Sequence, residues 1–284
     1  MSNVLIAGCG YVGIALASLL SSDQHTVWGL RRKIDLLKGS ITPISADLTN
    51  PQSLSQIPQG LDFVFYTAAA DTQSDAAYRM AYIVGLSCLI QTLKFQDQCP
   101  KRIFFTSSTA VYSQTKGEWV DEGSPTNPNH FAGARLLEAE SLVKGSVFPS
   151  TVVRFGGIYG PGRTRLITQA RERGIQVSES NQCYTNRIHR DDCAGVLKHL
   201  MRLAEPDSLY LAVDGEPALD SDVARWLAGR LGIPVSSGVA AARVIRQGRS
   251  NKRCCNQKLL SSGYCFKYPT YREGYLELMG GEGA

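Results

Sequence analysis

The sequence has 284 residues, of which 43% are hydrophobic and 19% are charged, and its formal net charge is +5. This length and composition are typical of a soluble globular protein that buries one large core, or one core with a smaller lobe. The mild positive charge is spread along the chain, so it does not indicate a nucleic-acid partner. Binding of an anionic cofactor or substrate would be enough to account for it. No apolar run approaches the length of about eighteen residues that a membrane span needs, so we expect none.

The eight cysteines indicate a reducing compartment. They show no paired metal-ligand spacing, and several fall in apolar or helical patterns, as reduced cysteines in a cytoplasm do. The apolar N-terminus has no basic region and is broken by three glycines, which argues against a secretory signal peptide. We therefore expect a cytoplasmic protein.

The N-terminal residues carry the most informative pattern of the sequence. A short apolar run at residues 4–7 is followed by the motif G-x-G-x-x-G at residues 8–13, and then by an Ala- and Leu-rich helical pattern at residues 14–20. A strand, this motif and a helix in that order form a dinucleotide-binding turn. The context therefore predicts a bound dinucleotide.

Each glycine of the motif has its own expected role. Gly8 permits the tight turn, Gly10 lets the backbone approach a diphosphate, and Gly13 lets the helix pack closely on its strand. Tyr11 and Val12 begin the helix, whose free N–H groups and positive dipole end face the phosphates. These five residues form the predicted diphosphate site.

The residues after the second predicted strand, residues 26–30, indicate which dinucleotide is bound. Arg31 and Arg32 follow that strand, and no Asp or Glu lies between Asp23 and Asp35. An acidic side chain at this place would bind a ribose 2′-hydroxyl, whereas an arginine accommodates a 2′-phosphate. We expect NADP rather than NAD, although a solvated basic loop would also explain the arginines.

Strand-like and helix-like segments alternate along the first half of the chain. Further strands are expected at residues 41–46, 62–67, 102–106 and 151–155. Long helices are expected at residues 76–95 and 131–144. This alternation predicts a doubly wound parallel α/β sheet, a Rossmann domain, over residues 1–156.

The pattern loosens in the second half of the chain. Helices are expected at residues 164–173, 191–204 and 220–231, with extended pieces at residues 186–190 and 208–213. Asp191 and Asp192 are expected to cap the second of these helices, and the tail is expected to be irregular. The pattern predicts a smaller C-terminal α/β substrate lobe over residues 157–284, with some segments returning to the Rossmann sheet.

Several other segments share an order and spacing with known enzymes. Besides the glycine motif, they are Asp47 and residues 68–70, 107–112, 154–162 and 188–192. With these segments the chain resembles an atypical member of the extended short-chain dehydrogenase/reductases, the superfamily of the NAD(P)-dependent epimerases and dehydratases. The cofactor contacts that the resemblance implies are Asp47, Leu48, Ala68, Ala69, Ala70, Thr106, Ser107, Phe155 and Gly156.

The resemblance breaks at the catalytic tyrosine. Such enzymes use Tyr-x-x-x-Lys on one helix face, where the lysine lowers the phenol pKa and the phenolate moves a proton. Phe131 and Arg135 occupy the two positions here, while Ser108 matches the serine that holds the substrate oxygen. Arg135 could neutralise developing charge or fix the ribose. Because phenylalanine has no titratable proton, a residue other than Phe131 would have to transfer the proton to or from the substrate.

Other side chains are candidates for the missing proton donor. His130 precedes the helix and could act as acid and base, although a residue at a helix start is more often structural. Tyr112 and Lys116 form a literal Tyr-x-x-x-Lys, but loop-forming residues surround them, so we interpret the pair as fortuitous. Tyr184 is a conceivable donor that sequence alone cannot place.

The substrate side is expected to be anion-binding. Guanidinium forks suit phosphate, so Arg163, Arg165 and Arg187 could bind a phosphorylated or nucleotide-linked substrate, although any one of them could be solvated. His189 with its two following aspartates resembles a metal cluster on paper, but helix capping explains the aspartates better, so no metal is expected. The predicted substrate contacts are Thr109, Tyr159, Arg163, Arg187 and His189.

Two functions stay open at this stage. One is an NADP-dependent oxidoreductase or epimerase acting on a nucleotide-sugar-like or other small polyol or carbonyl substrate. The other is a non-catalytic NADP-binding redox sensor or regulator, which Phe131 favours, because a bound ligand can shift two states only through differential affinity. A homodimer through the two long helices is expected by analogy alone.

Overall fold

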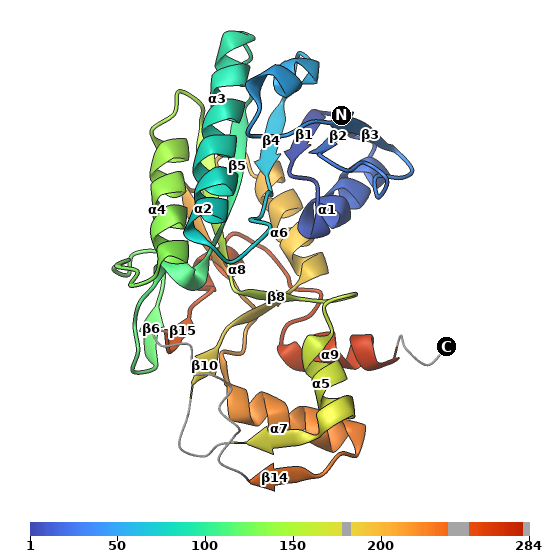
Figure 1. Ribbon diagram of the computed structural model, residues 1–284, viewed down its shortest axis with the longest axis vertical. Coiled ribbons are helices and arrows are strands. Elements are labelled where there is room, and N and C mark those ends of the chain that lie inside the picture. Colours follow the sequence, from blue (N-terminus) through green and yellow to red (C-terminus); the bar gives the residue numbers. More distant parts are fainter. Residues whose placement is uncertain (178–182, 238–249, 281–284) are drawn as a thin grey trace.

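The structure is a computed structural model that describes residues 1–177, 183–237 and 250–280. A sheet domain and a smaller lobe are stacked along the long axis of the molecule (Figure 1). All strand pairs within the main sheet are parallel. Its strands are β1 (Asn3–Ala7), β2 (Thr26–Arg31), β3 (Ile41–Ser45), β4 (Phe63–Tyr66), β5 (Arg102–Ser108), β7 (Ser150–Phe155) and β12 (Leu209–Ala212).

The strand order is β12-β7-β5-β4-β1-β2-β3, so the winding reverses between β1 and β4. This order confirms the predicted doubly wound parallel sheet. The inner strands are buried on both faces: Leu5, Val64, Phe104 and Val152 are 0% exposed. Burial on both faces explains why these strands appear in the sequence as continuous apolar runs.

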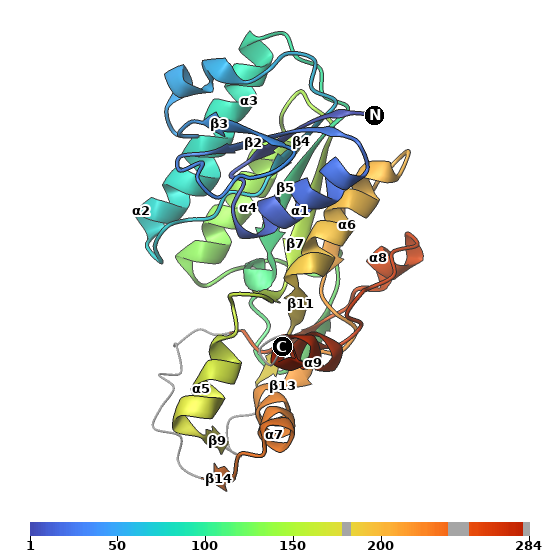
Figure 2. The same ribbon diagram turned by 90° about the vertical axis from the view of Figure 1, so that its right-hand side faces the viewer.

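Helices cover both faces of the sheet (Figure 2). One face carries α1 (Tyr11–Ser22) and α6 (Arg190–Arg202), which pack on each other. The other carries α3 (Gly85–Phe95) and α4 (Phe131–Lys144), so α4 has the predicted bounds. The predicted helix at residues 76–95 is continuous but changes type, from α2 (Asp75–Tyr78) through the π-helix η2 (Arg79–Val84) to α3.

The lobe has its own core of buried side chains, among them Tyr159, Ile167, Val223 and Tyr271. Its helices are α5 (Arg165–Arg173), α7 (Asp220–Leu231) and α9 (Tyr271–Gly280). Its paired strands are β8 (Gly157–Tyr159) with β11 (Arg187–His189), β9 (Ile175–Val177) with β14 (Val235–Ser237), and β10 (Tyr184–Thr185) with β13 (Ala218–Leu219).

The tail is not irregular, so that prediction is wrong. After residue 249 the chain forms β15 (Lys252–Cys254), α8 (Gln257–Ser261) and α9. β15 pairs in parallel with β6 (Glu118–Val120), an extension of the sheet domain. Such pairing between distant segments leaves no local signal, because a strand of three residues is too short to show a recognisable alternation of apolar and polar residues. Two short 3-10 helices complete the described elements, η1 (Pro51–Gln56) and η3 (Thr109–Val111).

One helical segment of the described residues, Asp75–Phe95, is long and apolar enough to cross a membrane. In this fold it covers the sheet, and its Leu86, Leu89 and Leu93 are 0% exposed. Core helices of soluble proteins can have the same length and apolar composition, so one such helix is weak evidence for a membrane span.

A buried ion pair joins the sheet to α4. Arg154 on β7 donates to both carboxylate oxygens of Glu140, at 2.9 and 2.6 Å, and the two side chains are 5% and 3% exposed. Arg154 also donates to Tyr112 Oη at 2.8 Å, and Ser107 donates to Glu140 at 2.6 Å. These contacts satisfy the charges that the fold buries.

We expect Glu140→Gln to lower the free energy of unfolding by about 3–5 kcal/mol, because it leaves the Arg154 charge buried without a counter-ion. The matched control is Glu138→Gln on the same helix, whose half-exposed pair with Arg135 contributes about 0–1 kcal/mol. Urea denaturation of the three proteins measures both values. Equal losses in the two variants would contradict the assignment.

Candidate active site

The glycine turn connects β1 to α1. Gly8 has a φ of 78°, and a side chain there would overlap the backbone of Ala68. A Cβ on Gly13 would lie 2.8 Å from Thr67 Oγ1, so α1 packs closely on the sheet. At Gly10 the nearest atom to a Cβ would be Gly8 O at 3.7 Å, so the protein leaves space there for a ligand.

A large cavity of about 1160 Å³ runs along the carboxyl ends of the strands. It extends from the end of β2, over the glycine turn, to the ends of β5 and β7. This crevice, where the strand order reverses, is the usual ligand site of open α/β sheets. The predicted residues that line it are Gly8, Gly10, Tyr11, Val12, Arg31, Arg32, Asp47, Leu48, Ala68, Ala69, Thr106, Ser107, Ser108, Phe155, Gly156 and Arg163.

The end of the large cavity beside β2 is cationic. Arg31 Nη1 is buried and has no hydrogen-bond partner among the described residues. Arg32 donates to both carboxylate oxygens of Asp71, at 2.7 and 2.8 Å, and the pair is exposed. A phosphate oxygen is the acceptor that an unpartnered guanidinium nitrogen suits.

Asp47 lies next to this cationic end, directly after β3. Its Oδ1 accepts hydrogen bonds from the Thr49 backbone N–H at 2.9 Å and from Thr49 Oγ1 at 2.8 Å. These bonds hold the pKa of the Asp47 carboxyl below its ordinary value. A fixed carboxylate therefore lines the large cavity.

At the opposite end of the cavity, the hydroxyls at the end of β5 differ in their partners. Thr106 donates to Tyr66 O at 3.0 Å, and Ser107 donates to the buried Glu140. Ser108 Oγ instead accepts from the Ala110 N–H at 3.2 Å. Ser108 thus keeps its own O–H for a donor role, while the other two hydroxyls support the fold.

The helix face that should carry the tyrosine and lysine is used for packing. The Phe131 ring meets Tyr78 edge-on, with centroids 5.3 Å apart. Arg135 donates to both oxygens of Asp75, at 2.8 and 2.9 Å, and to Glu138 at 2.8 Å. These contacts hold α2 against α4. Neither Phe131 nor Arg135 is among the described residues that line the cavity.

Two other sequence candidates also have structural partners. His130 Nδ1 accepts from the Ala132 N–H at 3.3 Å and caps the start of α4. Tyr112 is 1% exposed and donates to Asp121 O at 2.7 Å. Its sequence neighbour Lys116 is exposed on the loop. Tyr112 is therefore a core residue and Lys116 a loop residue, which agrees with the interpretation of the Tyr-x-x-x-Lys match as fortuitous.

Part of the large cavity wall was missed in the sequence analysis. Met80, Ala81 and Tyr82 line it from the π-helix η2. Burial raises the pKa of Tyr82 to about 12, and the nearby Ala70 backbone acts in the opposite direction. Ala70 itself is not among the lining residues. π-Turns are frequent at functional sites, but their presence cannot be recognised from the residue types alone.

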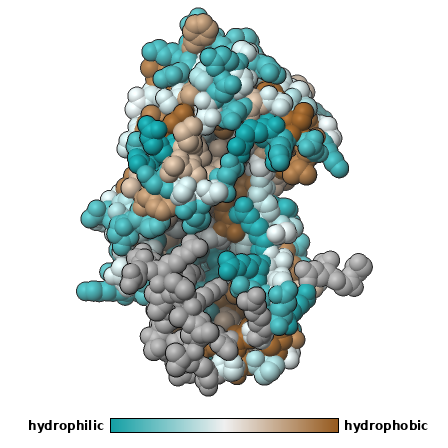
Figure 3. Space-filling view, in the orientation of Figure 1, coloured by the Kyte–Doolittle hydropathy of each residue, from teal (hydrophilic) through white to brown (hydrophobic). Residues whose placement is uncertain are grey.

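A second cavity of about 360 Å³ adjoins the first, and Ile158 lines both. It lies on the side of the lobe, and the space-filling view shows the surface hollowed between the two parts of the molecule (Figure 3). Of the predicted substrate contacts, Thr109, Tyr159 and Arg187 line the second cavity, as does Tyr184. Ser250, Lys252 and Tyr275 also line it and were missed.

The second cavity is lined by two buried cations. Arg187 is 9% exposed, lies 3.6 Å from Asp220 and hydrogen-bonds Thr185. Lys252 is 4% exposed and donates to Tyr112 O at 3.3 Å. The wall of the second cavity therefore contains two cationic side chains, each with partners within the fold.

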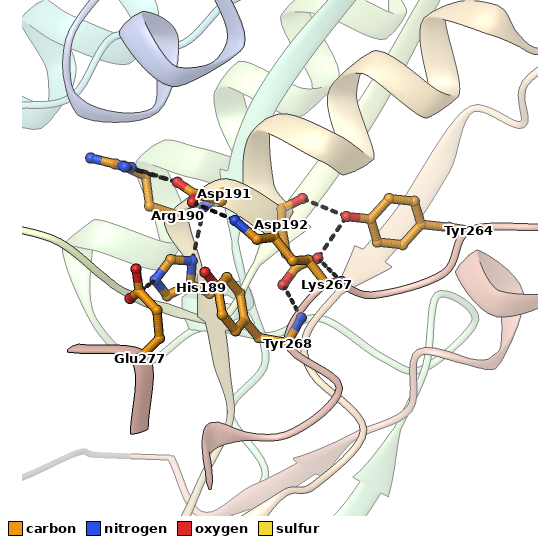
Figure 4. Close-up of polar contacts among 8 residues, drawn as sticks. All are labelled: His189, Arg190, Asp191, Asp192, Tyr264, Lys267, Tyr268 and Glu277. Carbon is orange, nitrogen blue, oxygen red and sulfur yellow. Dashed lines mark hydrogen bonds and ion pairs between the residues drawn. The ribbon is translucent and has the colours of Figure 1, made fainter. Parts of the chain in front are cut away.

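His189 is not among the described residues that line either cavity, and it directly precedes α6 (Figure 4). Its Nδ1 accepts from the Asp191 N–H at 3.2 Å, so the histidine is the helix cap and the predicted capping by aspartates is wrong. Burial lowers the pKa of His189 to about 4, and its Nε2 lies 3.9 Å from Glu277.

Asp192 ties the tail to the sheet domain. Its carboxylate accepts hydrogen bonds from Tyr264 Oη at 2.8 Å and from the N–H groups of Lys267 and Tyr268 at 2.7 and 3.0 Å (Figure 4). Across residues 1–177, 183–237 and 250–280, no three Cys, His, Asp or Glu side chains gather as a metal site would require.

Comparison with known proteins agrees with this geometry. The model of the NAD dependent epimerase/dehydratase family matches residues 4–203. The chain belongs to that family. It is 30% identical to protein YeeZ of Escherichia coli K12 over 219 residues, which cover 74% of this chain and 77% of YeeZ.

Two solved structures extend the likeness. A Methylobacillus flagellatus protein, provisionally assigned to the NAD-dependent epimerases/dehydratases, has a TM-score of 0.84 at 36% identity and covers 99% of this chain and 98% of its own. Human epimerase family protein SDR39U1, solved with NADPH, has a TM-score of 0.77 at 19% identity. The match covers 96% of this chain and 97% of SDR39U1. The second likeness concerns the fold alone. The atypical epimerase-like resemblance seen in the sequence is confirmed.

Asp214, which follows β12, is 2% exposed, and its backbone N–H donates to the backbone O of Arg187 at 2.6 Å. Its Oδ1 accepts from the Glu216 N–H at 3.2 Å, while Oδ2 has no partner among the described residues. Burial raises the pKa of this carboxyl from 3.8 to about 8.

The folded protein therefore keeps a proton on Asp214 between about pH 4 and pH 8, where the unfolded chain has lost it. Linkage then makes the contribution of Asp214 to the free energy of unfolding fall as the pH rises through this range, by an amount on the order of a few kcal/mol. His189, whose pKa is lowered, acts in the opposite direction below about pH 6.5. We therefore expect the wild type to lose stability relative to Asp214→Asn as the pH rises, and the exposed Asp222→Asn to follow the wild type. Chemical denaturation from pH 4 to pH 8 measures this, and parallel curves for Asp214→Asn and wild type would contradict it.

Proposed function

We propose that this protein binds NADP and exchanges a hydride with a carbon of a small anionic polyol or carbonyl substrate in the second cavity. The observation that carries the proposal is the junction of the two cavities. Ser108 lines the large cavity, Thr109 lines the second, and Ile158 lines both. A bound nicotinamide would supply the hydride donor or acceptor.

The residues around the glycine turn fit an adenine dinucleotide. The space at Gly10 would admit a diphosphate, and the Asp47 carboxylate would accept a hydrogen bond from the adenine. Arg31 supports NADP over NAD because its buried Nη1 lacks a partner among the described residues. Arg32 would contribute less, since Asp71 already pairs with it.

We expect Arg31→Ala to raise the Kd of NADP+ about 10- to 100-fold, the value of a charge-assisted hydrogen bond, and to leave the Kd of NAD+ within about twofold. Arg32→Ala, the matched control, should have the smaller effect on NADP+. Calorimetric titration of both dinucleotides measures these values. A wild type that binds NAD+ more tightly than NADP+ would contradict the NADP assignment and leave the family cofactor in place.

For the substrate, we propose that Ser108 donates its O–H to the reacting oxygen and that Tyr184 moves the proton. The second cavity offers phenols at Tyr159, Tyr184 and Tyr275. Burial raises the pKa of Tyr159 and Tyr275, which makes them poor proton carriers. Tyr184 is only half-buried, lines this cavity, and has the Arg253 guanidinium 5.0 Å from its ring centre.

We expect Tyr184→Phe to lower kcat about 100-fold or more, the usual contribution of a general acid and base, without changing the Kd of NADP+. Tyr78→Phe is the control, because this phenol contacts Phe131 and yet lines neither cavity. The assay follows NADPH absorbance with phosphorylated and carboxylated sugars and polyols. Full activity in Tyr184→Phe would exclude this role.

A second function, an NADP-binding redox sensor or regulator, is favoured by one observation. Phe131 and Arg135, at the two positions that normally carry the chemistry, both hold helices together. Affinity that differs between NADP+ and NADPH, without turnover of any substrate in the panel, would support this function. Turnover by the wild type would exclude it.

We also propose a cytoplasmic homodimer. Apolar side chains on η2, α3 and α4 are only partly buried, among them Ile83, Ile90, Leu137 and Leu142. A second copy could cover this face. Sedimentation of the wild type would reveal the dimer.

A further inference from the structure

Arg163 lies where the lobe meets the glycine turn. It ends a tight turn after β8, in which its N–H donates to Gly160 O at 2.8 Å. Its guanidinium carbon is 4.0 Å from the centre of the Tyr11 ring. Tyr11 is the first residue of α1, so this arginine lies beside the helix N-terminus that the sequence assigns to the diphosphate.

The turn that carries Arg163 is fixed on Tyr11. The phenol of Tyr11 donates to Pro161 O at 2.9 Å. Gly160 has a φ of 141°, and a Cβ there would lie 2.9 Å from Tyr11 Oη, so a side chain would separate the two segments. The position of Arg163 is therefore set by two independent contacts.

A second arginine shares the Tyr11 ring but is already paired. Arg190 lies 5.4 Å from the ring centre and donates to Asp191 at 3.0 and 2.8 Å (Figure 4). Among the described residues no carboxylate lies within ion-pairing distance of Arg163, which is exposed and lines the large cavity. Arg163 thus has its charge available for a ligand.

We propose that Arg163 binds the cofactor diphosphate and does not bind substrate. The inference rests on the proposed function, because it requires a dinucleotide in the large cavity. A planar guanidinium stacked on an aromatic ring keeps its N–H edge free, and two phosphate oxygens match that edge. The diphosphate would then be held from both sides, by the N-terminus of α1 and by a side chain of the lobe.

Binding would also reach the second cavity through the backbone. The strand that precedes this turn, β8, pairs with β11, and Tyr159 and Arg187 of these two strands line the second cavity. The diphosphate and the second cavity would therefore contact adjoining parts of one strand pair.

The test is calorimetric titration of Arg163→Ala with NADP+ and with adenosine 2′-monophosphate, which lacks the diphosphate; NAD+ replaces NADP+ if the wild type prefers it. We expect the Kd of the dinucleotide to rise about tenfold and that of the monophosphate to stay within about twofold. Arg163→Lys should recover part of the affinity. Arg165→Ala, which removes the same charge two residues away on the exposed start of α5, should change neither Kd.

An equal loss of affinity for both ligands would mean that Arg163 only maintains the shape of the turn, and it would overturn the proposal. Unchanged affinity for the dinucleotide would overturn it as well. A wild type that binds no dinucleotide would instead refute the proposed function, so the two failures are distinguished by the wild-type titration alone.

Discussion

The buried pair of Arg154 and Glu140 is the interaction on which the rest of the site depends. It joins the last inner strand to α4, and Glu140 also accepts from Ser107, one residue before Ser108. A buried ion pair contributes little net stability, but it is strongly disfavoured when one partner is displaced. The pair therefore fixes the ends of β5 and β7 relative to α4, and the candidate reaction centre lies between these elements.

This arrangement explains how α4 can keep its place without the usual catalytic residues. Phe131 packs on Tyr78, and Arg135 pairs with Asp75, so both positions now hold α2 in place. The phenyl ring of Phe131 supplies the packing energy of this contact, and the hydroxyl of a tyrosine would not increase it. The α4 positions that match the catalytic tyrosine and lysine are thus used here for support, through contacts with α2.

The fold could be predicted from the sequence wherever a short local pattern carries the information. The glycine turn, α4 and α7 are such cases, because turn residues and the helical period fix them within a few residues. Lys252 and Tyr275 could not be assigned to the second cavity, since they reach it through contacts with segments more than sixty residues away. Asp75, which joins Arg135 to α2, lies sixty positions upstream, and a contact of this kind likewise leaves no trace in the local pattern.

Two contacts join the tail to earlier parts of the chain: β15 pairs with β6, and Asp192 accepts a hydrogen bond from the Lys267 N–H. Both can form only after the tail has been synthesised. During synthesis the N-terminal part of a chain emerges and folds first. The strands and helices around the glycine turn can therefore form on the ribosome before residues 250–280 have left it. In a nascent chain the crevice along the strand ends would then form some time before the second cavity, whose wall is completed last by Lys252 and Tyr275.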